Sequence, residues 1–206
     1  MTPYYKHDGI TIYCADNREV FPMLGKFDLL LTDPPYGLAD KLHGGSWGKK
    51  FEGKDKDWDA APPTDLLLAS AISACEHQII WGGNYVRVRP SRCWLSWFKP
   101  DAPPTMGHFE LAWTSFDQNT RQISCSIAST NKERIGHPTQ KPLRVMLWCL
   151  CIAGESVRTI LDPWMGSGTT LVAAKLRGLE ATGIEISEDY CKLAVERLRQ
   201  GVLVPA

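Results

Sequence analysis

The feature that most constrains this chain is a largely apolar run, Phe27–Thr32, that ends in Asp33-Pro34-Pro35-Tyr36. An apolar run closed by two prolines predicts a buried strand that stops at a rigid corner, because proline fixes φ and has no N–H to donate. At that corner Asp33 and the carbonyl of Pro34 offer hydrogen-bond acceptors, and Tyr36 offers a flat ring. Such a set suits a planar ring with an exocyclic amino group, such as adenine or cytosine. The alternative is a simple turn with a partly buried tyrosine.

A second motif, Asp162-Pro163-Trp164-Met165-Gly166-Ser167-Gly168-Thr169, follows the apolar segment 157–161. It leads into residues 171–176, which are apolar at helical spacing, so the local order is strand, glycine-rich turn and helix. Gly166 and Gly168 let the backbone approach a ligand closely, and the start of the helix offers unpaired N–H groups. These features favour a cofactor site over a purely structural turn.

The next predicted strand, 181–186, carries Glu185 near its end, where an α/β nucleotide site places its ribose ligand. The turn has two of the three glycines of the dinucleotide fingerprint, and Asp162 precedes it. A nucleoside with a small charged tail is therefore favoured over a pyrophosphate. S-adenosylmethionine is such a molecule.

With a third motif, His137-Pro138-Thr139-Gln140-Lys141-Pro142, these two resemble the amino-methyltransferases of DNA. Because the tetrapeptide precedes the cofactor motif, the order resembles the permuted β group, and the small size resembles the compact phage or prophage type. The resemblance runs from about residue 9 to about residue 199. It implies catalytic roles for Asp33, Pro34, Pro35 and Tyr36, with the first residue and the proline carbonyl holding the target amine.

The resemblance also implies a set of cofactor-binding residues. Glu185 would bind the ribose hydroxyls and Asp16 the adenine ring, although an isolated acid such as Asp16 is more often an ordinary helix cap. Thr139 and Lys141 would lie by the methionine end. The remaining candidates belong to the second motif: Asp162, Pro163, Trp164, Gly166, Ser167, Gly168 and Thr169.

Alternation of strands and helices predicts an α/β fold of one domain, residues 1–206, with a mostly parallel sheet and helices on both faces. The resemblance makes this a circularly permuted, Rossmann-like, S-adenosylmethionine-dependent methyltransferase fold. Strands are expected at 10–14, 27–32, 78–81, 157–161 and 181–186, with an antiparallel hairpin at 92–99 and 108–115. Helices are expected at 18–24, 64–76, 142–153, 171–176 and 188–199. Trp94, Trp97 and Trp113 are expected in the core.

Two segments lack a regular hydrophobic period. Residues 38–63 mix lysines and aromatics with acids, which is compatible both with a mobile loop that closes over DNA and with a solvated linker. Residues 117–136 are polar, and the resemblance implies that this small insertion recognises the target. The turn Gly82-Gly83-Asn84-Tyr85 is expected on the same sheet edge as Tyr36.

Composition bears on the partners, the metal content and the compartment of the protein. The chain has 23 basic and 23 acidic residues, so its net charge of zero argues mildly against tight duplex binding. Its seven cysteines lack a zinc spacing, so we expect reduced thiols, no metal and a cytoplasmic protein. The apolar runs are too short for a membrane span.

The expected reaction is methyl transfer from S-adenosylmethionine to the N6 amine of adenine in DNA, by direct attack on a flipped base. Asp rather than Ser at position 33 favours adenine, because cytosine-specific members of the family tend to have serine there. The alternatives are cytosine N4, an amine or amide of RNA or protein, and cofactor binding without catalysis. DNA is the expected partner, a homodimer is left open and no membrane is expected.

Overall fold

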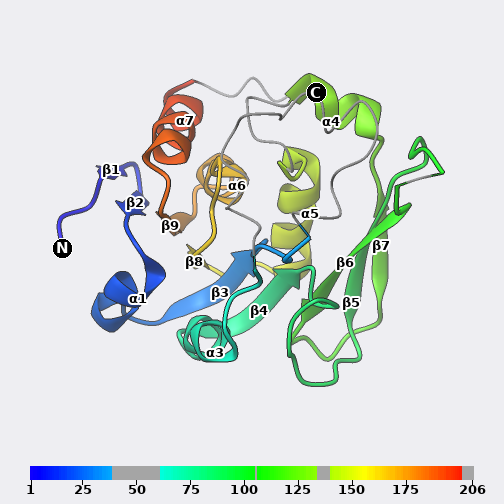
Figure 1. Ribbon diagram of the computed structural model, residues 1–206, viewed down its shortest axis with the longest axis horizontal. Helices are drawn as coiled ribbons and strands as arrows, with labels where there is room; N and C mark the ends of the chain where they lie inside the picture. The colour runs from blue at the N-terminus through cyan, green and yellow to red at the C-terminus, as the bar shows by residue number, and fades with distance from the viewer. Residues whose placement is uncertain (39–60, 105, 134–139, 201–206) are drawn as a thin grey trace.

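The computed structural model describes residues 1–38, 61–104, 106–133 and 140–200. These residues form a nine-stranded sheet in the order β1-β2-β9-β8-β3-β4-β6-β5-β7, with helices packed on both of its faces (Figure 1). In chain order the strands are β1 (Tyr5–His7), β2 (Ile10–Cys14), β3 (Phe27–Thr32), β4 (Cys75–Trp81), β5 (Trp94–Phe98), β6 (Phe109–Thr114), β7 (Arg121–Ser124), β8 (Thr159–Asp162) and β9 (Glu180–Glu185).

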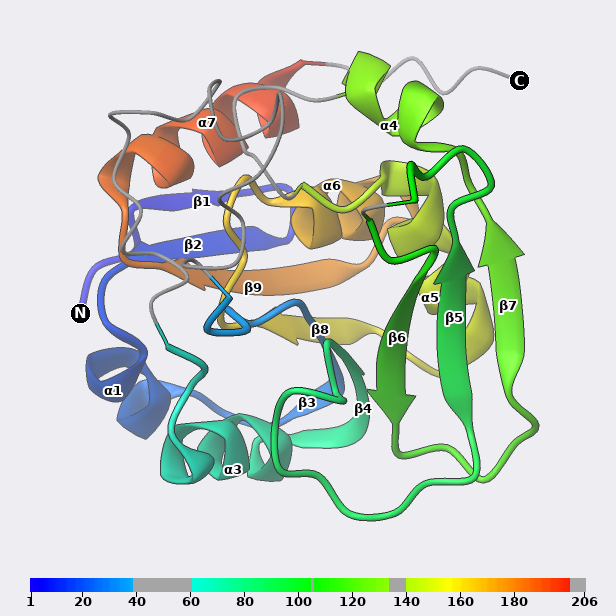
Figure 2. The same ribbon diagram turned by 45° about the vertical axis from the view of Figure 1, so that its right-hand side comes forward.

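The centre of the sheet is parallel, because β2, β9, β8, β3 and β4 pair side by side in one direction. β6 then runs antiparallel to both β4 and β5, and β7 pairs parallel with β5 at the far edge (Figure 2). The mostly parallel sheet and the antiparallel hairpin are both as predicted. The strand that carries the tetrapeptide, β3, lies next to β8, the strand that precedes the glycine-rich turn.

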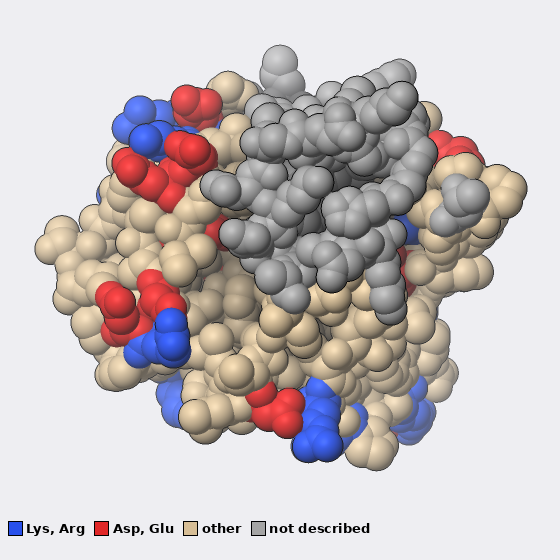
Figure 3. Space-filling model, viewed as in Figure 1, with Lys and Arg blue, Asp and Glu red and all other residues tan. Residues whose placement is uncertain are grey.

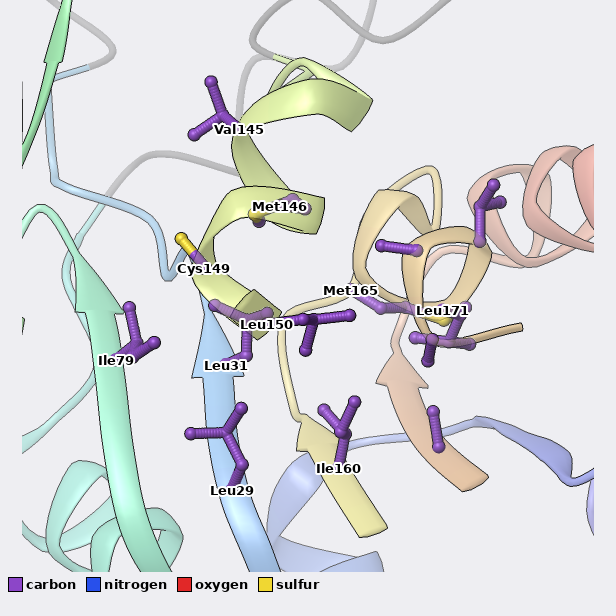
Figure 4. Close-up of a cluster of buried hydrophobic side chains, with 14 of the residues drawn as sticks. Leu29, Leu31, Ile79, Val145, Met146, Cys149, Leu150, Ile160, Met165 and Leu171 are labelled. Carbon is purple, nitrogen blue, oxygen red and sulfur yellow. The ribbon is translucent and has the colours of Figure 1, made fainter. Parts of the chain in front are cut away.

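Three helices cover one face of the sheet: α5 (Leu143–Ala153), α6 (Thr169–Leu176) and α7 (Glu188–Arg199). Figure 4 shows Leu29, Leu31 and Ile160 of the sheet facing Leu150 of α5 and Leu171 of α6. The other face is covered by α1 (Asn17–Val20), the 3-10 turn η1 (Phe21–Met23) and α3 (Asp65–Ser73). Both faces of the central strands are therefore buried, which explains their continuous apolar sequences.

Several boundaries differ from the prediction by a few residues. β4 begins at Cys75, so α3 ends at Ser73 rather than at Glu76, because Cys75 already pairs with Phe27 of β3. Pro142 is the residue before α5 rather than its first helical residue. Thr64 caps α3 as predicted, its hydroxyl accepting from the backbone N–H of Leu67 at 3.3 Å.

Three elements were not predicted, namely β1, β7 and α4 (Ile127–Glu133). The two strands are short, exposed edge strands whose sequences lack apolar alternation. The start of α4 is fixed by a distant carboxylate, since Asp101 accepts hydrogen bonds from the backbone N–H groups of Ile127 and Ala128 at 2.6 and 2.8 Å. These elements depend on tertiary pairing, which local sequence patterns do not report.

The surface has no simple charge polarity in the view of Figure 3, where acidic and basic side chains are interspersed among uncharged ones. Within the part of the chain that the structure describes, no helix has the length and apolarity needed to cross a membrane. Trp97 and Trp113 are buried and Trp94 is half-buried, as expected of core aromatics.

Candidate active site

The tetrapeptide and the glycine-rich motif meet at the carboxyl ends of two neighbouring parallel strands, as predicted. Asp33 follows the end of β3, and Asp162 is the last residue of β8. The hydroxyl of Thr32 donates to the carboxylate of Asp162 at 2.7 Å, which ties the two strand ends together across 130 residues of sequence. A ligand bound by one motif therefore lies within reach of a ligand bound by the other.

Asp33 has a partner at each carboxylate oxygen. The hydroxyl of Tyr36 donates to Oδ1, and the Nζ of Lys141 donates to Oδ2 at 2.6 Å. Lys141 also lies 3.2 Å from the Tyr36 hydroxyl and 3.0 Å from Oε2 of Glu110. The other oxygen of Glu110 accepts from Lys99 at 2.8 Å. The tetrapeptide is thus backed by a chain of alternating charges.

Burial and ion pairing shift the pKa values of Asp33, Glu110 and Lys141 within this chain of charges. Burial raises the pKa of Asp33, and the neighbouring ammonium of Lys141 only partly offsets it. Burial also acts to raise the pKa of Glu110, but Lys141 and Lys99 outweigh it and bring the value down to about 2. Burial would lower the pKa of Lys141, yet its two carboxylates hold it well above the ordinary value. Lys141 is therefore a permanent cation between two carboxylates.

The turn that follows β4 fixes the position and orientation of the Tyr36 ring. Tyr85 stacks on it with ring centroids 4.9 Å apart and planes 22° apart. Gly82 has φ +67°, and a Cβ on it would lie 1.9 Å from the Tyr36 ring, so only glycine fits there. This confirms that the turn after β4 and Tyr36 share one edge of the sheet.

The glycine-rich turn is built from backbone geometry. Gly166 and Gly168 have φ values of 49° and 77°, and Gly168 directly precedes the first residue of α6. The carboxylate of Glu185, at the end of β9, accepts from the backbone N–H of Gly166 at 3.1 Å and from that of Ser187 at 2.8 Å. Burial raises the pKa of Glu185, and these backbone donors partly offset the rise.

Arg197 of α7 holds this turn from behind, a role that the sequence analysis missed. Its Nη1 lies 2.6 Å from the carbonyl oxygen of Ser167, 3.1 Å from the Ser167 hydroxyl and 3.0 Å from the Thr169 hydroxyl. All three side chains are buried. Both hydroxyls that were predicted to bind cofactor therefore contact Arg197. The helical period of α7 does not show that this arginine turns inward, so the sequence carried no signal for it.

Asp162 and Pro163 form the base of the turn. Burial raises the pKa of Asp162 to about 6, although the hydroxyl of Thr32 and the backbone N–H of Trp164 donate to it. The carbonyl of Pro163 accepts from Nδ2 of Asn17 at 2.6 Å. Oδ1 of Asn17 is buried and has no hydrogen-bond donor among the residues described. An acceptor of this kind suits a ligand donor.

Four of the predicted cofactor residues lie apart from the glycine-rich turn, pack in the core or fall outside the described residues. Asp16 caps α1 and pairs with Arg18 at 2.6 Å, which agrees with the capping alternative, while its contact with the cofactor adenine stays a prediction. Lys141 contacts the tetrapeptide instead of the glycine-rich turn. Thr139 lies outside the described residues, as does most of 38–63. Trp164 is half-buried and packs against the cluster of buried residues that includes Leu161.

Lys99 and Glu110 were also missed. Both belong to the antiparallel hairpin, Glu110 within β6 and Lys99 just after β5. Each stands in an otherwise apolar, aromatic-rich stretch. Opposite charges in two strands that are expected to pair are the sequence signal that would have revealed them.

Comparison with known proteins agrees with this geometry. Residues 76–196 match the family model for N6 and N4 DNA methylases, which covers more than half of the chain. The chain is 42% identical to the type II methyltransferase M2.LlaDCHI of Lactococcus lactis subsp. cremoris, over 97% of this chain and 93% of the relative. An α/β sheet with two motifs at adjacent strand ends, in a chain so similar to these proteins, defines the class. The chain belongs to the N6/N4 DNA methyltransferase family.

Solved structures show the same fold at lower identity. The crystal structure titled as the M1.HpyAVI-SAM complex is 23% identical, with a TM-score of 0.61 over 92% of this chain and 99% of that one. The PvuII DNA methyltransferase, titled cytosine-N4-specific, is 16% identical, with a TM-score of 0.65 over 98% of this chain and 90% of that one. The permuted methyltransferase fold predicted from the motif order is therefore confirmed.

Proposed function

We propose that this protein transfers the methyl group of S-adenosylmethionine to the N6 amine of adenine in DNA, on a base turned out of the duplex. The observation that carries the proposal is the placement of Asp33 and Tyr36 beside the glycine-rich turn. The hydroxyl of Thr32 is hydrogen-bonded to the carboxylate of Asp162 at 2.7 Å and joins the two strand ends. Family membership supports methyl transfer to an exocyclic amine of DNA. An enzyme that modifies a base must extract it from the stack, and an aromatic pocket stabilises the extracted base.

The residues around the glycine-rich turn fit S-adenosylmethionine. Glu185 is anchored by backbone N–H groups and retains lone pairs for ribose hydroxyls. The left-handed glycines keep the turn free of Cβ atoms, and the buried Oδ1 of Asn17 is an acceptor without a donor among the described residues. When bound, S-adenosylmethionine supplies a methyl group activated by its positive sulfur. One relative of this fold was crystallised with this molecule, as its title states.

In the proposed reaction the chain's own residues activate and orient the amine. An aromatic amine is a poor nucleophile because its lone pair is delocalised into the ring. Asp33 and the carbonyl of Pro34 would each accept one N–H of the amine, which favours a pyramidal nitrogen with an available lone pair. Tyr36 would stack on the base. As the nitrogen–carbon bond forms and the sulfur–carbon bond breaks, the amine loses a proton, and Asp33 is placed to receive it.

The assignment of adenine rests on Asp at position 33 of this sequence. The second candidate is cytosine N4, since the PvuII enzyme of similar fold is titled as specific for that position. Both bases present an amino group of the same chemistry, so the tetrapeptide alone admits either. RNA or a protein amide is the further alternative.

The decisive assay incubates labelled S-adenosylmethionine with DNA, RNA and protein acceptors and identifies the methylated product by mass spectrometry of the hydrolysate. We expect N6-methyladenine from DNA. N4-methylcytosine without N6-methyladenine would overturn the base assignment, and label in RNA or protein alone would overturn the substrate.

The variant Asp33→Ala tests the role of the tetrapeptide. It should reduce methyl transfer by at least about 100-fold, because a preorganised hydrogen-bonding group is lost from the reacting amine. Binding of S-adenosylmethionine, measured by calorimetry, should change by no more than about threefold. Loss of binding instead would place Asp33 in the cofactor site.

We propose that DNA is also contacted by two segments at the rim of the site. Residues 117–136 were predicted to recognise the target, and their described part contains β7 and α4, with Arg121 exposed on β7. Residues 38–63, described only at their ends, follow the tetrapeptide directly. Exchange of the segment 117–136 for that of a relative should change the methylated sequence, read by sequencing of modified DNA.

A further inference from the structure

Four charged residues form a buried cluster behind the tetrapeptide, and we call Asp33, Lys141, Glu110 and Lys99 the charged cluster. Their side chains are 20%, 5%, 28% and 7% exposed, respectively. They come from four places in the chain: the end of β3, the segment before α5, strand β6 and the end of β5. Burying four charges is costly, so such an arrangement in a fold of this size calls for a functional reason.

Lys141 is the centre of the charged cluster. Its ammonium lies within hydrogen-bonding distance of three acceptors: Oδ2 of Asp33 at 2.6 Å, Oε2 of Glu110 at 3.0 Å and the hydroxyl of Tyr36 at 3.2 Å. An ammonium has three N–H groups, so all of its donors are engaged within the protein. Lys141 therefore serves Asp33 and Tyr36 rather than a ligand.

Asp33 has a particular need for a fixed negative charge. Its Oδ1 already accepts from the hydroxyl of Tyr36 and its Oδ2 from Lys141, so a substrate N–H must find a further lone pair. A carboxylate has about four acceptor positions, whereas a protonated carboxyl turns one oxygen into a donor. Burial favours the protonated form, and a nearby cation opposes it.

We propose that Lys141 is a positioning residue for methyl transfer, which keeps Asp33 ionised and fixed in orientation, while Glu110 holds Lys141 from its other side. The inference rests on the proposed function and adds to it a second group that determines how the amine is held. Glu110 has Lys99 as a second cation, so the carboxylate that depends on Lys141 alone among the described residues is Asp33.

The test compares Lys141→Met, Lys141→Arg and the matched control Lys99→Met. Lys99 is as buried as Lys141 and belongs to the same cluster, but its ion pair is with Glu110 and not with Asp33. Single-turnover methyl transfer to DNA is measured at saturating S-adenosylmethionine from about pH 5 to about pH 9, with binding of S-adenosylmethionine followed by calorimetry.

For Lys141→Met we expect the acidic limb of the rate profile to move upward by at least about one pH unit, so that on that limb the rate at a given pH falls about tenfold below that of the unmodified protein. The direction follows because loss of the cation makes Asp33 easier to protonate. Lys141→Arg should restore most of the original profile, since a guanidinium is always charged. Lys99→Met should leave the limb within about half a unit, and binding of S-adenosylmethionine should be little changed in all three.

An equal loss of rate at every pH for Lys141→Met, or an equal shift for Lys99→Met, would overturn the inference and make Lys141 a structural residue. If Lys141→Met does not fold, the double variant Lys141→Met, Glu110→Gln is used instead, because it removes one positive and one negative charge from the charged cluster. The position of the acidic limb of its rate profile is then compared with that of the unmodified protein. Absence of methyl transfer by the unmodified protein would instead overturn the proposed function. The two failures are therefore distinguishable.

Discussion

The two halves of the site are held by different means. The glycine-rich turn at the end of β8 is shaped by its own backbone, with left-handed glycines, backbone N–H groups on Glu185 and a single arginine behind it. The tetrapeptide at the end of β3 is shaped by side chains from distant segments, above all Lys141 and the ring of Tyr85. The glycine-rich half, or turn side, is a local motif. The tetrapeptide half, or assembly side, is put together from segments that are far apart in the sequence.

Under the proposed function, this difference has a physical basis in what each half must do. A cofactor with a ribose and a charged tail is bound by many backbone groups, which need only a tight turn. An amine must be held at one angle by a buried carboxylate, and a buried carboxylate needs partners from outside its own loop. Perturbing the assembly should therefore affect turnover, whereas perturbing the turn should affect binding and stability.

Among changes outside the tetrapeptide itself, the largest effect should come from Gly82→Ala on the assembly side. The new Cβ would lie 1.9 Å from the Tyr36 ring, so the ring must move, and a displacement of this size costs about 100-fold in rate. Gly178→Ala is the matched control, because Gly178 has nearly the same φ, +65°, with open space around its Cβ position. Methyl-transfer rates for the two variants check this, and equal losses would show that backbone strain alone is responsible.

On the turn side, Arg197→Met should lower the free energy of unfolding by about 2 kcal/mol, because the buried acceptors of Ser167 and Thr169 lose their donor. Affinity for S-adenosylmethionine should fall about tenfold while the rate from the bound state changes little. Arg199→Met, on the exposed side of the same helix, is the control and should be nearly neutral. Denaturation and calorimetry provide both readouts; a loss in rate with unchanged affinity would contradict the comparison.

Asp162 lies where the two halves meet, and its pKa gives a prediction with a definite sign. Burial raises it from 3.8 to about 6, so the folded state binds the proton more tightly than the unfolded chain. The ionised group therefore costs stability, fully above about pH 6 and hardly at all below about pH 4. At about 1.4 kcal/mol per unit, Asp162→Asn should stabilise the fold at pH 7 by about 3 kcal/mol, a gain that disappears in acid.

Asp28→Asn is the opposite-sign control for Asp162. The backbone N–H groups of Arg158 and Thr159 lower the pKa of Asp28, so its charge adds stability that is present at neutral pH and lost as the pH falls through the folded pKa. Thermal denaturation of both variants across pH should give curves that separate as the pH rises from about 4 to about 6 and stay apart above it. Parallel curves would contradict the assigned burial of Asp162.

The smallest effect should come from Tyr85→Ala. Removing the ring that stacks on Tyr36 at 4.9 Å forfeits about 1 kcal/mol of aromatic contact, so kcat/KM should fall about fivefold. Tyr85→Phe keeps the ring and should behave like the unmodified protein. A loss with both variants would assign the effect to the hydroxyl and not to the stack.

Sequence reasoning predicted the local half of the site well. The strand, glycines, helix and Glu185 follow one another within a short stretch, and the hydrophobic periods of β3, β8 and α7 stand out clearly. The same holds for the hairpin of β5 and β6, whose apolar runs pair as expected.

The assembled half was predicted only in part. Asp33 and Tyr36 are in a recognisable tetrapeptide, but the partners of Asp33 depend on which strands become neighbours. Lys141 was assigned to the cofactor because its motif resembles the element that lies by the methionine end of the cofactor, and only the three-dimensional structure shows its contact with Asp33 at 2.6 Å. Arg197 was read as one residue of an amphipathic helix, since a periodicity does not show which polar residue turns inward.

The order of the strands also bears on how the protein matures during synthesis. β2 and β3 leave the ribosome early, yet they are separated in the sheet by β9 and β8, which emerge among the last described elements. Until then the apolar flanks of both early strands stay open, and the tetrapeptide and the glycine-rich turn do not yet lie side by side. The site is therefore complete only after β8 and β9 have taken their places between β2 and β3.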